Sequence, residues 1–204
     1  MLARNRTRYP AMTSPSLHNA PLGPMLRRWR LLHRVKQSHA AGMFGVSQST
    51  ISRWEAGMQE AEPEQRAQIE ALLRARLDSA ADHALARLVA SNSQPVHLVC
   101  DLTHRLLACS AARAAEFSVP HTELLGRSLW PFVTEAIATQ EAKLDGLGWR
   151  EGIAAPALEF ATGTNDSLLV PIRQSQCRWT RLTLSDGSTA RLVETLRADR
   201  FAHI

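Results

Sequence analysis

The short segment GVSQSTISRWEAG, residues 45–57, fixes the position and both ends of one helix. The Ser47 hydroxyl can cap a helix start, and Gly57 can take the left-handed conformation that ends one. The sequence therefore predicts a helix over residues 48–56. At the helical period, Ile51 and Trp54 share one face with Thr50, and polar side chains occupy the opposite face: Gln48, Ser49, Ser52 and Arg53. We expect the apolar side chains to anchor this helix in a core.

Charge is distributed unevenly along the chain. Residues 1–76 carry 12 Lys and Arg against 5 acidic residues, a net charge of +7, and the remaining residues carry 12 against 14, a net charge of −2. A basic surplus confined to one end is typical of a domain that binds a polyanion. A basic surface that only keeps the protein in solution is the alternative interpretation.

The polar face of the 48–56 helix carries side chains that can read DNA. In the major groove, Gln can pair with adenine, Arg with guanine, and Ser with several base edges. Together with the basic surplus, this face predicts double-stranded DNA as a partner. A helical domain that packs on protein and never meets DNA is the competing hypothesis.

Residues 35–57, VKQSHAAGMFGVSQSTISRWEAG, resemble the helix-turn-helix of phage Cro-like and repressor-like DNA-binding domains. The matching positions are Gln37, Ala41, Gly45, Val46, Ser47, Ile51, Trp54, Glu55 and Gly57. The resemblance implies an all-α, five-helix, repressor-like domain over residues 23–77. It also implies a phosphate contact for Gln37 and a structural ion pair between Arg30 and Glu55. The remaining DNA-binding candidates are Ser47, Gln48, Ser49, Ser52 and Arg53.

Three positions depart from the repressor-like pattern. Ala40 stands where leucine is usual, and Gly42 lies inside a predicted helix, where glycine costs about 1 kcal/mol relative to alanine. Arg34 replaces the glycine that usually follows the first helix of the pattern.

Residues 64–94 contain no Gly or Pro, and their apolar residues recur at steps of three and four. This pattern predicts one long helix or two abutting helices that link the two halves of the chain. Local core packing and a dimerising signalling helix are both open interpretations.

The region after residue 94 changes to strand-like patterns. PVHLVCD and HRLLACS flank a turn and precede AARAAEF, which favours a helix; ALEFATG, SLLVPIRQS, CRWTRLTLSDG and TARLVETL predict three or four further strands. This order indicates an α+β domain with helices on one face of an antiparallel sheet.

Residues 100–132, CDLTHRLLACSAARAAEFSVPHTELLGRSLWPF, resemble the PAS fold. The matching positions are Asp101, Arg105, Ala112, Glu123, Leu124, Gly126, Arg127, Ser128 and Leu129. Ser110 replaces the usual Asn of this pattern, and His104 replaces its usual Gly. The resemblance implies a PAS-like sensory or dimerisation domain over residues 95–196, which would bind a small ligand, haem or flavin, or would only dimerise.

The sequence does not designate a cofactor or a metal. It lacks the Asn-Cys-Arg motif of flavin-binding PAS domains, and His97, His104 and His121 are expected at the surface or in caps rather than as haem ligands. His97 and Cys100 fall on opposite faces of a strand, which argues against a shared zinc. The aromatic residues of this region are expected in the core, although they could line a pocket: Trp130, Phe132, Trp149, Phe160 and Trp179. No catalytic motif is present, so we do not expect an enzyme.

The sequence thus predicts a two-domain transcription regulator. Its parts are a disordered basic arm, the helix-turn-helix domain, a linker helix, the PAS-like domain and a tail, over residues 1–22, 23–77, 78–94, 95–196 and 197–204. The arm could also stem from an over-extended start codon or be an organelle transit peptide. The expected partners are double-stranded DNA, a second copy of the chain and a small-molecule ligand. A protein-interaction adaptor that works through the PAS-like domain and an antitoxin-like autoregulator are the alternatives.

Composition adds two expectations about the environment of the protein. The three cysteines lack a zinc-finger spacing, which favours free thiols in the cytoplasm. No run of about 18 apolar residues occurs, so no membrane partner is expected.

Overall fold

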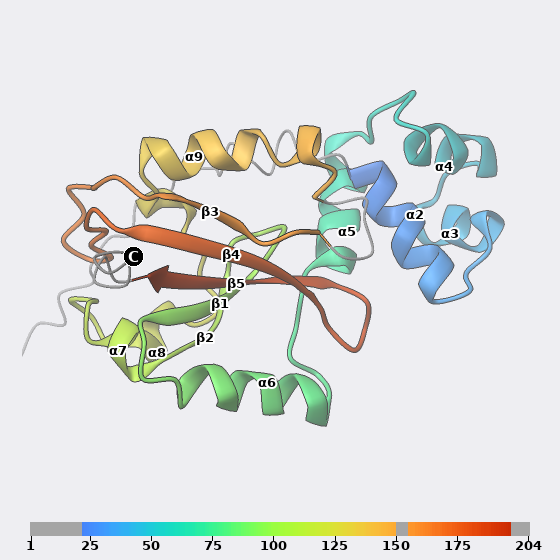
Figure 1. The fold of residues 1–204 in the computed structure, drawn as a ribbon. Coiled ribbons are helices and arrows are strands. Elements are labelled where there is room, and N and C mark those ends of the chain that lie inside the picture. Colours follow the sequence, from blue (N-terminus) through green and yellow to red (C-terminus); the bar gives the residue numbers. More distant parts are fainter. Residues whose placement is uncertain (1–21, 150–154, 197–204) are drawn as a thin grey trace, which may run out of the picture.

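The computed structural model describes residues 22–149 and 155–196, which form a helical domain at one end of a five-stranded sheet (Figure 1). Residues 1–21 of the predicted arm and the whole predicted tail, residues 197–204, lie outside the described residues. Within the described residues, five helices precede the sheet: α2 (Leu22–Leu32), α3 (Gln37–Phe44), α4 (Gln48–Glu55), α5 (Pro63–Leu73) and α6 (Ala80–Ala90). The first four pack together, and the fifth packs against strands of the sheet.

The helix predicted over residues 48–56 is confirmed as α4. The Ser47 hydroxyl accepts a hydrogen bond from the Thr50 N–H at 3.1 Å, which satisfies one of the unpaired donors at the helix start. Gly57 follows the helix in the left-handed region, at a φ of 69°. Ile51 and Trp54 are buried and hold α4 on the core of the helical domain.

Glycine at position 23 sets the distance between α2 and α4. A Cβ atom there would lie 1.8 Å from the backbone oxygen of Trp54, near the end of α4. Only glycine therefore lets the start of α2 come this close to the recognition helix. The sequence analysis did not identify this position.

The prediction of one long helix or two abutting helices over residues 64–94 is wrong, because a non-helical segment separates α5 from α6. Arg74 is extended, and Ser79 starts α6 as part of a capping box with Asp82. Between them, the backbone N–H of the buried Ala75 donates to the Cys100 sulfur at 3.4 Å. An extended chain lets Ala75 reach the sheet, which one continuous helix could not do.

The sheet is antiparallel throughout, with the strand order β2-β1-β5-β4-β3. Its strands are β1 (Val96–Cys100), β2 (Leu106–Cys109), β3 (Leu158–Ala161), β4 (Gln176–Thr183) and β5 (Thr189–Leu196). The predicted α+β layout with an antiparallel sheet is therefore confirmed. The segment SLLVPIRQS, which could have been a fourth late strand, forms a loop instead. The side-chain amide of Asn165 donates a hydrogen bond to the Val170 backbone oxygen and accepts one from the Ile172 N–H. These bonds hold the loop in place.

Helices lie on both faces of the sheet rather than on one (Figure 1). Helix α6 covers one face, and α9 (Glu135–Ala142) lies over the opposite face. Because strand residues alternate between faces, Val96, Leu98 and Cys100 join the cluster on the α6 side. The apolar cluster on that side is continuous with the core of the helical domain through Ala75. The two domains consequently share one core.

Candidate DNA-reading surface and interior cavity

The polar face predicted on α4 lies at the surface of the helical domain. The side chains of Gln48, Ser49, Ser52 and Arg53 are all exposed. Helices α3 and α4 lie at the end of the molecule that is remote from most of the sheet (Figure 1). This arrangement leaves the face open to a large partner such as a DNA duplex.

Ser47 combines exposure with a structural role. Its hydroxyl caps α4 and also lies 2.8 Å from the Ser49 hydroxyl and 2.9 Å from the Thr50 hydroxyl. The three hydroxyl groups therefore form a small network at the start of α4. A DNA contact by Ser47 remains a prediction.

Arg30 and Glu55 form a bidentate ion pair that ties α2 to the end of α4. Arg30 Nε lies 2.6 Å from Glu55 Oε1, and Nη2 donates to Oε2 at 2.8 Å. Burial alone would raise the pKa of Glu55, but hydrogen bonds from Arg30 and Gln37 outweigh burial and lower it. Arg30 also donates to the Val35 backbone oxygen at 3.0 Å, so the pair fixes the chain that leads into α3.

The side chain of Gln37 belongs to the same network. Its amide nitrogen donates to Glu55 Oε2 at 3.0 Å. The phosphate contact expected of Gln37 would therefore fall to its backbone N–H at the start of α3, where helices favour anions.

A shallow hollow at the start of α3 is lined by basic side chains that were not among the predicted DNA-binding residues. Arg34, Lys36, Ser38 and His39 line it with exposed side chains. Arg34 has a φ of 55°, so it occupies the left-handed conformation of the glycine that it replaces. Its unusual residue type at that position was the available signal.

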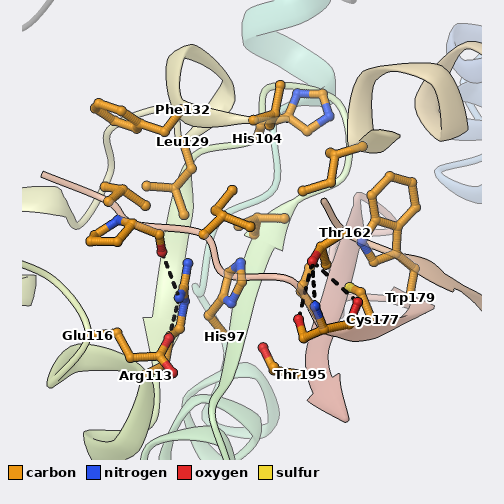
Figure 2. Close-up of a pocket in the computed structure, with 18 of the residues that line it drawn as sticks. His97, His104, Arg113, Glu116, Leu129, Phe132, Thr162, Cys177, Trp179 and Thr195 are labelled. Carbon is orange, nitrogen blue, oxygen red and sulfur yellow. Dashed lines mark hydrogen bonds and ion pairs between the residues drawn. The ribbon is translucent and has the colours of Figure 1, made fainter. Parts of the chain in front are cut away.

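The sheet domain contains an interior cavity of about 150 Å³. It lies between the sheet and the segments 129–137 and 170–173. Figure 2 shows the side chains around this cavity. Its apolar wall includes Val99, Leu129, Phe132, Val170 and Val193. A cavity of this volume can hold a molecule about the size of benzene.

Two polar side chains line one part of the cavity. His97 comes from β1, and Arg113 comes from the short helix α7 (Ala111–Ala114). Both are more than nine-tenths buried, and His97 Nδ1 and Arg113 Nε have no hydrogen-bond partner among the described residues. Burial first, and the charge of Arg113 second, hold the pKa of His97 well below its usual value. The imidazole is therefore neutral at pH 7.

A buried charge cluster lies beside the cavity. Arg191 Nε donates to Asp101 Oδ1 at 2.7 Å, and Arg191 Nη1 donates to Glu141 Oε2 at 2.5 Å. The guanidinium also lies over the rings of Trp149 and Trp179, 5.5 Å and 4.2 Å from their centroids. Burial opposes the charge of Arg191, but the two carboxylates outweigh burial and raise its pKa. Burial likewise opposes the charge of Glu141, but the charge of Arg191 lowers its pKa, so Arg191 and Glu141 are both charged at neutral pH.

The prediction that the three histidines of this region lie at the surface or in caps is wrong for two of them. His97 and His104 are buried and line the cavity, whereas His121 is exposed at the start of α8 (His121–Leu124). His104 has a φ of 54°, and its Nε2 lies 3.5 Å from Glu141 Oε2. Among the expected core aromatics, three also line the cavity: Trp130, Phe132 and Trp179.

The three cysteines are buried, and none of them forms a disulfide bond. Within residues 22–149 and 155–196, no group of three or more His, Cys, Asp or Glu side chains could hold a metal ion. None of the helices in these ranges is long and apolar enough to cross a membrane.

Comparison with known proteins matches the helical domain to a family. A helix-turn-helix family model matches residues 26–78, about a quarter of the chain. Among curated proteins, none matches this chain.

Solved structures similar to this chain include several PAS domains. The PAS domain of an HTR-like protein from Haloarcula marismortui has a TM-score of 0.42 and 17% identity, and the match covers 57% of this chain and 90% of that one. The PAS domain of nitrogen regulation protein NR(II) from Vibrio parahaemolyticus has a TM-score of 0.40 and 13% identity, with coverage of 55% and 96%. An RNA-binding light-oxygen-voltage receptor has a TM-score of 0.42 and 10% identity, with coverage of 94% and 65%. Residues 26–78 thus match the helix-turn-helix family model, and they are joined to an α+β domain whose sequence motif resembles the PAS fold.

Proposed function

We propose that this chain is a sequence-specific DNA-binding transcription regulator of the cytoplasm, a binding protein rather than an enzyme. One observation carries the proposal. Helix α4 exposes Gln48, Ser49, Ser52 and Arg53 while Ile51 and Trp54 anchor it, and this helix lies within the residues that match the helix-turn-helix family model. Such a helix can enter the major groove and pair with base edges.

The surroundings of α4 supply the phosphate contacts that this function requires. Arg34 and Lys36 are exposed at the start of α3, next in the chain to the first backbone N–H groups of that helix. Contacts from cationic side chains and helix starts to phosphate fix the register of a protein on DNA without reading its sequence. In this proposal, α3 positions the domain and α4 reads the bases.

We assign the sheet domain to small-molecule sensing, to dimerisation, or to both. The cavity supports sensing because it combines apolar walls with polar groups that have no partner. The shared core and two further contacts support coupling between the domains. Arg28 donates to the Thr183 hydroxyl at 3.2 Å, and His33 Nε2 lies 2.5 Å from the Asp186 backbone oxygen.

Selection of bound fragments from a random DNA pool tests the proposal, with the full chain as the bait because its two domains share a core. A regulator that binds as a homodimer should enrich a two-fold symmetric consensus whose half-sites lie about 34 to 36 Å apart. A single half-site would retain the DNA-reading function and exclude the homodimer. Enrichment of no sequence at all would contradict sequence-specific binding.

Sedimentation of the same full-length protein checks the dimer independently of DNA. The proposal predicts a dimer in solution, because a single helix-turn-helix domain grips one half-site. A monomer at all concentrations, in the absence and in the presence of the selected duplex, would contradict it.

A further inference from the structure

The cavity of the sheet domain has a chemical character that narrows its ligand. Two of its polar side chains, Arg113 and His97, lie near each other, and the carboxylate of Glu116 lies next to Arg113 (Figure 2). Most of the remaining wall is apolar or aromatic and includes Leu129, Phe132 and Val193. A ligand that satisfies both parts needs one polar end and an apolar body.

Arg113 leaves the buried Nε edge of its guanidinium without a hydrogen-bond partner among the described residues. Its two hydrogen bonds both use Nη1, to the Glu116 carboxylate and to the Pro171 backbone oxygen. Burying an unpaired guanidinium donor is costly, so this edge favours a ligand that brings an acceptor. The planar donor pair of a guanidinium edge matches the two oxygens of a carboxylate.

His97 provides a third donor next to Arg113. Its Nδ1 is buried without a partner, and the neutral ring can donate one hydrogen bond. A neutral histidine adds no second positive charge, and Glu116 already pairs with Arg113, so a ligand carboxylate would take the place of Glu116 on Arg113. A phosphate dianion would leave excess charge buried against apolar walls, which is unfavourable.

The charge cluster on the other side of the cavity points the same way. Its Arg191 lines the cavity and is already paired with the carboxylates of Asp101 and Glu141. The Arg191 guanidinium is therefore occupied and does not offer a free partner for a second carboxylate at that end. A dicarboxylate is therefore disfavoured relative to a monocarboxylate.

We propose that the cavity binds a small monocarboxylate with an apolar body about the size of a benzene ring, its carboxylate held by Arg113 and His97. The size follows from the volume of about 150 Å³. The inference rests on the sensory role proposed for the sheet domain and names the class of molecule that it senses.

Binding of benzoate and of benzamide to the full-length protein tests the proposal. The two molecules have nearly the same shape, but only benzoate carries a charge. Tryptophan fluorescence provides the readout because Trp130 and Trp179 line the cavity. Benzoate should bind saturably and at least about tenfold more tightly than benzamide, because hydrogen bonds to charged partners are about twice as strong as neutral ones. Equal affinities, or no saturable binding of benzoate, hexanoate and 3-methylbutanoate, would overturn the proposal.

Two variants test the assigned residues. Arg113→Met should weaken benzoate binding at least tenfold and leave benzamide binding nearly unchanged. Glu116→Gln removes the carboxylate that competes for Arg113, and it should tighten benzoate binding severalfold. Glu135→Gln removes an equal charge from an exposed position of α9 and should have no effect. If Arg113→Met fails to fold, Glu116→Gln still decides, because unchanged or weaker benzoate binding in that variant would contradict the competition.

The failure of this inference is distinguishable from failure of the proposed function. Gln48→Ala lies on α4 and should leave benzoate binding unchanged while it weakens DNA binding. Benzoate binding without any DNA selection would keep the site and remove the regulator. DNA selection without carboxylate binding would keep the regulator and overturn the site.

Discussion

The helical domain and the sheet domain place their polar side chains in opposite positions. Within residues 22–73, Glu55 is the only buried charged residue, Arg30 pairs with it, and the polar residues of α4 face outward. The sheet domain instead buries the cluster of Asp101, Glu141 and Arg191, and it lines a cavity with further polar groups. A domain that binds a large polyanion needs a polar outer surface, whereas a sensor of small molecules needs polar groups inside. The comparison therefore indicates where each domain acts.

Among the variants considered, removal of the buried cation Arg191 should destabilise the sheet domain the most. Arg191→Met leaves two buried carboxylates without their partner, which should lower the free energy of unfolding by about 3 to 5 kcal/mol. Urea denaturation measures the change. The exposed Arg178, which pairs with Glu159, is the matched control, and Arg178→Met should leave stability nearly unchanged. Equal losses in the two variants would show that burial does not distinguish the two ion pairs.

Addition of one methyl group should damage the helical domain almost as much. In Gly23→Ala, the new Cβ would collide with the backbone oxygen of Trp54, so α2 and α4 must separate. We expect a loss of at least about 2 kcal/mol in unfolding free energy, together with weaker DNA binding. Gly42→Ala is the control, because Gly42 is inside α3 with open space around it; alanine there should stabilise by up to about 1 kcal/mol. Thermal melting of both variants should therefore shift in opposite directions.

Acid should weaken the link between α6 and the sheet. Burial alone would raise the pKa of Asp82, but hydrogen bonds from Ser185 and Ser79 outweigh it and lower the pKa to about 2. Because the folded pKa lies below the unfolded value, the contribution of Asp82 is present above pH 4 and is lost as the pH falls through about 2. Asp82→Asn should remove this part of the acid dependence and lower stability at pH 7 by about 1 to 3 kcal/mol. An unchanged pH profile between pH 2 and 4 in that variant would contradict the assignment.

The smallest effects should come from the two residues that replace a usual glycine. Arg34 and His104 both adopt left-handed φ angles, which cost most residues about 1 kcal/mol or more. Arg34→Gly at the surface should be neutral or stabilising by up to about 1 kcal/mol. His104→Gly relieves the same strain but removes a buried ring that packs on Trp130, so we expect a net loss of about 1 to 3 kcal/mol. Stabilisation of both variants would show that the backbone, rather than the side chain, decides.

The sequence predicts the helical domain well because its signals are local. The cap at Ser47, the stop at Gly57 and the alternation of faces between them lie within one short segment. The partnership of Arg30 with Glu55 was inferred from the family pattern rather than from spacing. The close approach at Gly23 went unseen, because it depends on how α2 crosses α4 and no local pattern records that crossing.

The interior of the sheet domain could not be predicted in the same way. Asp101, Glu141 and Arg191 come from three distant parts of the chain, and only the folded sheet brings them together. His97 was expected at the surface, because a strand pattern does not reveal which face will be covered. The loop that contains Val170 has a strand-like composition, but Asn165 holds it against the cavity instead of a neighbouring strand.

The central claim is that α4 reads base sequence through its exposed polar face. The most direct test is titration of the full-length protein and its Gln48→Ala variant, at one fixed salt concentration, against the selected duplex and against random DNA. Loss of a bidentate contact to a base should cost about 1 to 3 kcal/mol on the selected duplex and far less on random DNA. Equal losses on the two duplexes would show that Gln48 does not specify sequence and would contradict the account.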